Sequence, residues 1–151
     1  MNEEIRNRFW TELLDKARHK TDLHAHKSPW GRYYLGSGWR SSGKRGMGFR
    51  YVMRQHDAEV DLYIHDPKDG AERNVAVFDY FAASKDEIES KFGRKLWWRR
   101  LEDKHACRIV APISLGGLRD EDRWPEIQDA MIDNMIRLEK ALRPHIAKLP
   151  V

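Results

Sequence analysis

Apolar and polar side chains alternate along two neighbouring stretches of the chain, residues 47–54 and 58–65. Strict alternation is typical of a strand with one buried face, so both stretches are predicted to be strands. A two-residue turn between them would place Met53 opposite Val60 on the buried face. A similar alternation over residues 32–40 predicts a further strand before this hairpin.

Apolar residues three or four positions apart predict helices at both ends of the chain and in its middle. One of these helices has clear end signals. Ser84 and Glu87 form a capping box at its start, and Gly93 follows its last apolar residue. The predicted helices span approximately residues 3–19, 75–82, 85–92 and 124–149.

Two further strands are expected over residues 96–101 and 107–113, joined by a turn at residues 102–105. The complete order of elements is then α-β-β-β-α-α-β-β-α. This order predicts an α+β fold in which a mostly antiparallel sheet of about five strands carries helices on one face. The chain has no internal repeat and no linker, so we expect a single domain over residues 1–151.

The composition excludes several classes of protein. Hydrophobic residues make up 40% of the 151 residues and charged residues 34%, a globular profile at the polar end. No apolar run approaches the roughly 18 residues of a membrane span, and the charged N-terminus has no signal-peptide core. A single cysteine, Cys107, excludes an internal disulfide and a cysteine-based zinc finger. We therefore expect a cytoplasmic protein without membrane contact, cofactor or bound metal.

Positive charge is concentrated in one part of the sequence. The net charge is only +4, but no acidic residue lies between Asp22 and Asp57, where basic and aromatic residues are interleaved. Such side chains hold phosphates and stack on bases. A second basic cluster surrounds Trp97 and Trp98. The candidate nucleic-acid-binding residues are Arg32, Trp39, Arg40, Lys44, Arg45, Arg50 and Arg54.

A glycine-rich turn is expected at residues 41–46, within this basic region. Its serines and glycines offer little apolar surface to bury, and Lys44 and Arg45 repel each other, so we expect a mobile basic hairpin that protrudes from the sheet. Residues 38–44 also match the first part of a phosphate-binding loop. However, Arg45 stands where Mg²⁺ coordination requires Ser or Thr, and the segment leads into a strand, so the match does not indicate an ATPase or GTPase.

Acidic residues on the third predicted strand leave one enzyme class open. The order α-β-β-β-α-β is also the core order of the PD-(D/E)xK nuclease fold, whose chemistry needs carboxylates on Mg²⁺ and a nearby lysine. Glu59 and Asp61 share one face of that strand, but Asp61 occupies the position of the lysine. An E-x-K sequence at residues 102–104 falls in a predicted turn. A degenerate or weak metal-dependent nuclease is therefore kept as an alternative.

Histidines alternate with other residues in the loop after the first predicted helix. Asp22, His24 and His26 would share one side of an extended segment, and two histidines with a carboxylate form a known metal-ligand set. Because the spacing is short and the segment is a loop, we expect a histidine-rich surface loop instead.

Motifs spread over most of the chain carry a family resemblance. They are Phe78-Asp79, Lys85-x-x-Ile-Glu89, Phe92-Gly93 and Leu96-x-Trp98-x-x-Leu101, together with Phe9-Trp10, the Val60-x-Leu-Tyr-Ile64 strand, Trp124, Met131 and Met135. With these motifs the chain resembles an uncharacterised bacterial domain family, one of the domains of unknown function. Members of that family often follow PD-(D/E)xK nuclease-like domains in restriction-like or phage-defence proteins. The resemblance supplies no catalytic residues and implies a nucleic-acid context by association.

These observations predict a non-enzymatic accessory module that binds DNA or RNA, in a phage-defence or restriction context. The sequence shows no base-reading helix, so phosphate contacts should dominate and binding should weaken steeply with salt. The first alternative is a protein-interaction domain, either a homodimer or a subunit of a nuclease or defence complex. Ile132 and Ile136 support it, because they widen the apolar face of the last helix. The second alternative is the weak nuclease.

Overall fold

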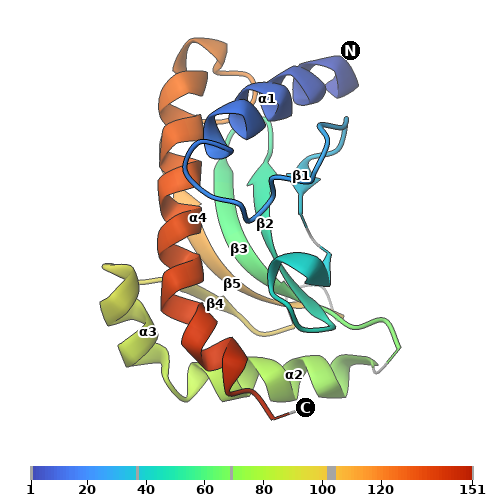
Figure 1. The fold of residues 1–151 in the computed structure, drawn as a ribbon, viewed down its shortest axis with the longest axis vertical. Helices are drawn as coiled ribbons and strands as arrows, with labels where there is room; N and C mark the ends of the chain where they lie inside the picture. Colours follow the sequence, from blue (N-terminus) through green and yellow to red (C-terminus); the bar gives the residue numbers. More distant parts are fainter. Residues whose placement is uncertain (1, 37, 69, 102–104, 151) are drawn as a thin grey trace.

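A five-stranded antiparallel sheet lies at the centre of the structure (Figure 1). The computed structural model describes residues 2–36, 38–68, 70–101 and 105–150. Each neighbouring pair of strands is antiparallel, which confirms the predicted α+β class and sheet. The strands are, in spatial order, β1 (Tyr34–Leu35), β2 (Met47–Met53), β3 (Ala58–Ile64), β5 (Cys107–Ile113) and β4 (Trp97–Arg99).

The described residues form four α-helices and two short 3₁₀ turns. The predicted bounds of the third helix are confirmed, because it ends where Gly93 adopts a positive φ of 106°. None of these helices combines the length and the apolar character needed to cross a membrane. The elements are α1 (Asn2–Ala17), α2 (Gly70–Ala82), α3 (Lys85–Phe92), α4 (Trp124–Ala147), η1 (Trp39–Ser41) and η2 (Glu121–Arg123).

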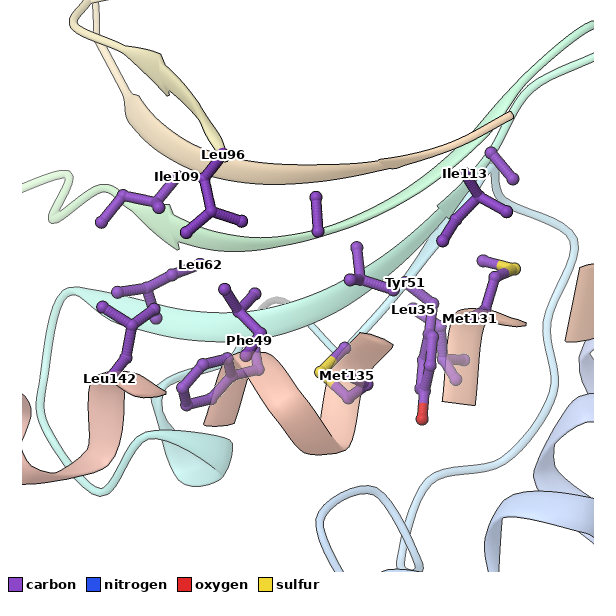
Figure 2. Close-up of a cluster of buried hydrophobic side chains, with 14 of the residues drawn as sticks. Leu35, Phe49, Tyr51, Leu62, Leu96, Ile109, Ile113, Met131, Met135 and Leu142 are labelled. Carbon is purple, nitrogen blue, oxygen red and sulfur yellow. The ribbon is translucent and has the colours of Figure 1, made fainter. Parts of the chain in front are cut away.

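The hydrophobic core lies between one face of the sheet and the helices. Figure 2 shows Met135 and Leu142 of α4 near Phe49 of β2 and Leu62 of β3, and all four side chains are buried. Ile132, which widens the apolar face of α4, is buried in the same core. Ile136, the other residue that widens this face, is partly buried and packs against the same core. Both residues therefore contribute to the domain's own core.

The hairpin of β2 and β3 has the predicted faces but not the predicted register. Met53 pairs with Ala58 and not with Val60. The difference is two residues, so every side chain keeps the face that the alternation indicated. The connecting turn, residues 54–57, is longer than expected because the loop after β5 holds it: Leu118 donates its N–H to the first carbonyl oxygen of the turn over 2.8 Å.

Only part of the strand predicted over residues 32–40 forms. β1 consists of Tyr34 and Leu35, and the chain turns away at Gly36, where φ is 97°. Gly36 passes so close to His24 that an added Cβ would lie 2.3 Å from the ring Nε2. This long-range contact ends the strand early, and the chain then enters η1.

Candidate nucleic-acid interface

The sheet face opposite the helices carries mainly polar and charged side chains, which alternate with the core residues along the strands. Val52 and Val110 lie on this face, and both are fully buried although neither belongs to the hydrophobic core shared with the helices. Long neighbouring side chains cover them. We call this layer the open face, and it consists of Arg50, Val52, Glu59, Asp61, Tyr63, Arg108 and Val110.

Asp61 joins two arginines at the centre of the open face. Arg50 donates two hydrogen bonds of 2.9 Å to its carboxylate, and Arg108 donates one of 2.7 Å. Arg108 also pairs with Glu59, which forms a second ion pair with Arg54 at an N–O distance of 3.1 Å. Burial alone would lower the pKa of Arg50 and of Arg108, but the facing carboxylates outweigh burial and raise the pKa of both.

These ion pairs occupy the carboxylates that the nuclease alternative would need as metal ligands. Asp61 is 0% exposed and Glu59 is also buried, and both carboxylates already accept hydrogen bonds from guanidinium groups. In the part of the chain that the structure describes, no three His, Cys, Asp or Glu side chains gather as a metal site. The E-x-K sequence at residues 102–104 lies outside the described residues. The geometry favours interpreting Glu59 and Asp61 as a salt-bridged strand face.

Aromatic rings and a guanidinium group form a continuous series of contacts from the β1 edge across the open face. Trp30 and Tyr33 each meet the Tyr34 ring in a T-shaped contact, with centroid distances of 5.3 and 5.1 Å. The Cζ atom of Arg50 lies 5.6 Å from the Tyr34 ring and 4.1 Å from the Tyr63 ring. We call this series the aromatic ladder, and it consists of Trp30, Tyr33, Tyr34, Arg50 and Tyr63.

The exposed end of the aromatic ladder lies beside α1. Trp30 is 38% exposed and Tyr33 is 42% exposed. The Trp30 Nε1–H donates to the Tyr34 carbonyl oxygen over 2.6 Å, which fixes the orientation of the indole. The two rings border an open groove of about 410 Å³, which we call the Trp30 groove and which is lined by Glu3, Arg6, Trp30, Gly31, Arg32 and Tyr33.

The residues that the sequence predicted to bind nucleic acid do not lie together in the structure. Arg32 lines the Trp30 groove. Arg50 is buried within the aromatic ladder, so it is not the surface phosphate contact that was expected. Arg54 is used in ion pairs at the β2–β3 turn, while Trp39 and Arg40 are exposed on η1.

The turn at residues 41–46 is anchored, so the prediction of a protruding hairpin without contacts is wrong. Ser41 and Ser42 are buried, and Arg143 of α4 donates hydrogen bonds of 3.0 and 2.8 Å to their carbonyl oxygens. The Ser42 hydroxyl donates to the Met47 carbonyl oxygen over 2.7 Å. Hydrogen bonds from serine hydroxyls and from an arginine that is distant in the sequence therefore hold the turn in place, without buried apolar side chains.

The two cations of this turn also have partners. The Lys44 Nζ donates to the Leu149 carbonyl oxygen over 3.1 Å. The Arg45 Nε donates to Asp66 over 2.8 Å, and Asp66 is buried. Both side chains thus hold the turn to other parts of the domain, and the turn has a structural role.

Removing the arginine anchor should loosen the turn. Arg143→Met keeps an unbranched apolar stem but removes both hydrogen bonds to the turn, so we expect the free energy of unfolding to fall by about 2 kcal/mol. Hydrogen exchange at the turn amides should also become faster. Arg137→Met is the control, because its ion pair with Asp133 on α4 is exposed. Equal exchange rates in the two variants would contradict this account.

The histidine-rich loop after α1 is only partly at the surface. Asp22 and His26 are exposed, but His24 is only 2% exposed and donates from Nε2 to the Phe49 carbonyl oxygen over 2.7 Å. Burial, opposed by this hydrogen bond, lowers the pKa of His24 to about 4. The expectation of a surface loop is therefore wrong for His24, which turns inward away from the other two side chains.

The second basic cluster lies at the opposite edge of the sheet, on and around β4. Trp97 is 47% exposed, and the Cζ atom of Arg99 lies 5.0 Å from its ring. Trp98 points toward the helices and donates from Nε1 to Glu89 over 3.0 Å. Trp97 pairs with Val110 and Arg99 pairs with Arg108, so both side chains lie on the open face, at the sheet edge opposite the Trp30 groove.

The sequence matches one protein family over nearly its whole length. The model of the family Domain of unknown function (DUF4268) matches residues 5–146. The chain belongs to the DUF4268 family. This finding confirms the resemblance to an uncharacterised domain of unknown function. No curated protein and no solved structure matches the chain. The part matched to DUF4268 includes all the strands described above and the whole aromatic ladder.

Proposed function

We propose that this DUF4268 domain is a non-enzymatic module that binds nucleic acid along the aromatic ladder. The observation that carries the proposal is the continuous series of rings and a guanidinium group that begins at an exposed groove and crosses the open face. Aromatic rings stack on bases of any sequence, at about 1–3 kcal/mol per base. Binding of this kind requires no helix in a DNA groove.

The ion pairs of the open face suit this function because they neutralise its acids. Asp61 and Glu59 would repel a phosphate backbone if they were unpaired, but each accepts hydrogen bonds from arginine. The same contacts hold Arg50 against the Tyr63 ring. These charged side chains are themselves buried, so they form a rigid, nearly neutral support for the exposed rings of Trp30 and Tyr33, on which bases can stack. Phosphate contacts then fall to exposed cations at the border of this support.

Arg32 supplies such a cation, because it is exposed and lines the Trp30 groove. Arg40 is exposed on η1 beside Trp39, but it lines a pocket with Asp22 and with Glu139 of α4, on the helix side of the sheet. Lys44 and Arg45 are already tethered within the domain, so we assign a phosphate contact to Arg32. The net charge of +4 supports association with a polyanion.

Salt dependence tests the proposal directly. Affinity for a fluorescently labelled oligonucleotide of mixed sequence, followed by anisotropy, should fall steeply between about 50 and 300 mM salt because counterions are released on binding. Each phosphate contact contributes about 0.7–0.9 to the slope of log K against log salt. Arg32→Gln should therefore reduce the slope by roughly 0.8, whereas Arg137→Gln should not. Absence of binding at 50 mM salt, or an affinity that does not change with salt, would refute the proposal.

The family context supports an accessory role beside a nuclease. Members of the family that the chain resembles often follow PD-(D/E)xK nuclease-like domains, so we propose that this domain delivers nucleic acid to such an enzyme in restriction or phage defence. Purification of the tagged protein from its native cells tests this proposal. Recovery of a nuclease-like protein supports it, and recovery of the domain alone speaks against it.

A protein partner is the second candidate for the same surface. Exposed tryptophan, tyrosine and arginine are also enriched at protein interfaces, and Trp30 with Tyr33 presents such a surface. Light scattering separates a homodimer from the nucleic-acid module. A strict monomer at high protein concentration removes the homodimer, and a dimer that Trp30→Ala dissociates would favour it.

A further inference from the structure

The Trp30 groove brings aromatic rings and guanidinium groups together in one hollow. We infer that it binds a single nucleotide unit of single-stranded nucleic acid, with the base on the rings of Trp30 and Tyr33 and the phosphate at Arg6 and Arg32. The inference rests on the proposed function and deepens it, because it assigns the form of the strand and the place of one nucleotide.

The aromatic wall of the groove is ordered before any ligand binds. Tyr34 lies against both Trp30 and Tyr33, at interplanar angles of 84° and 75°. The hydrogen bond from the Trp30 Nε1–H to the Tyr34 carbonyl oxygen fixes the indole further. Trp30 and Tyr33 nevertheless keep 38% and 42% of their surface exposed. A base can therefore stack on rings that lose little conformational freedom on binding.

The cationic wall offers hydrogen-bond donors that are not fully used. The Arg6 NH1 group makes only a long contact of 3.4 Å with the Gly31 carbonyl oxygen. The Arg6 Nε also has no hydrogen-bond partner among the described residues, but it is buried, so contact with a phosphate falls to the terminal NH groups of Arg6. Arg32 is exposed, with its Cζ atom 6.0 Å from the Trp30 ring. Phosphate oxygens accept several such bonds at once, because the guanidinium fork matches their geometry.

One acidic residue, Glu3, also lines the groove. Its carboxylate can accept hydrogen bonds from the amino and imino groups of a base, but it repels additional negative charge. The groove therefore suits a nucleotide that carries one phosphate, as each unit of a strand does, better than a nucleoside triphosphate.

The dimensions of the groove depend on a close approach between the chain and α1. A Cβ added at Gly31 would lie 2.8 Å from the Glu3 Cβ, so this segment packs directly on the helix. The resulting volume of about 410 Å³ lies within the range of small-ligand sites, roughly 300–1,000 Å³. A base within a duplex has both faces covered by its neighbours and must be unstacked to enter such a site. A single strand presents its bases without that cost.

Two binding measurements test the inference. In the first, the affinity for a single-stranded oligonucleotide is compared with that for the same sequence as a duplex, and the single strand should bind at least tenfold more tightly. Trp30→Ala should weaken single-strand binding by roughly 5- to 150-fold, the range that corresponds to the loss of one stacked base. Trp30→Phe, which keeps a ring, should recover most of the affinity. Trp97→Ala removes an exposed tryptophan at the opposite edge of the open face, outside the Trp30 groove, and should weaken binding clearly less than Trp30→Ala does.

The second measurement uses adenosine 5′-monophosphate and adenosine as probes, observed by saturation-transfer NMR. Transfer to the monophosphate should exceed transfer to the nucleoside, and Arg6→Gln should abolish the difference. If oligonucleotides bind but Trp30→Ala and Trp97→Ala behave alike, the nucleotide site is wrong and the proposed function stands. Equal affinity for single strand and duplex also overturns the inference. If no nucleic acid binds at low salt, the proposed function itself fails.

Discussion

Asp61→Ala is expected to lower the free energy of unfolding by about 3–5 kcal/mol, the usual cost of removing one partner from a buried ion pair. Asp61 is 0% exposed and accepts hydrogen bonds from both Arg50 and Arg108. Its removal leaves Arg50 buried without a carboxylate partner among the described residues and leaves Arg108 with fewer partners. Urea denaturation at pH 7, followed by far-ultraviolet circular dichroism, measures the loss.

Two control variants make this result interpretable. Asp57→Ala removes a carboxylate that is 52% exposed and pairs with Arg54 at the turn, so the free energy of unfolding should change by no more than about 0.5 kcal/mol. Arg50→Met combined with Asp61→Leu removes both charges of one pair and should cost less than Asp61→Ala alone. An Asp61→Ala protein as stable as the wild type would show that the network contributes nothing to the fold.

Acidification from pH 6.5 to 4 should destabilise the protein by about 3 kcal/mol through His24 alone. Burial lowers the pKa of His24 to about 4, and the nearby cations Lys27 and His26 act in the same direction. An unfolded chain has a histidine pKa near 6.5. Between these two values the unfolded state binds a proton that the native state excludes, so stability falls as the pH drops and levels off below about pH 4.

His24→Gln isolates this contribution from the titration of carboxylates. Glutamine can donate to the Phe49 carbonyl oxygen without acquiring a charge, so the variant should lose less stability than the wild type between pH 6.5 and 4. His19→Gln changes an exposed histidine just after α1 that does not act on His24, and this variant should follow the wild type. Denaturation curves at several pH values give the comparison. Identical pH profiles for His24→Gln and the wild type would rule out His24 as the source.

The sequence allowed the faces of the strands to be predicted, but not which residues pair between strands. Alternation is a local property, so it correctly places Arg50 and Asp61 on one face and Phe49 on the other. The register depends on the loop after β5, where Leu118 holds the β2–β3 turn. The bounds of α3 were predictable because Gly93, which ends the helix, lies next to it in the sequence. The capping box predicted at its start is not formed, because the Ser84 side chain makes no capping hydrogen bond.

The candidate interface was predictable only in part, for the same reason. The run of aromatic residues around Trp30 and Tyr33 is visible in the sequence, and Arg32, a candidate binding residue, lies within it and lines the same groove. Arg6 lies on the first helix, and nothing local indicates that it lines the same groove. The turn at residues 41–46 was misjudged because Arg143, its anchor, is distant in the sequence.

The charged layer of the open face also disfavours incorrect pairing of the strands. If β3 slipped by one residue against β2, Glu59 and Asp61 would move into the apolar core, and Val60 and Leu62 would be exposed to water. Such a pairing is far less stable than the native one, so slipped hairpins should be short-lived during folding. The same layer offers no continuous apolar surface against which the sheet of a second chain could stack. The face that the helices leave uncovered therefore also protects the protein against aggregation.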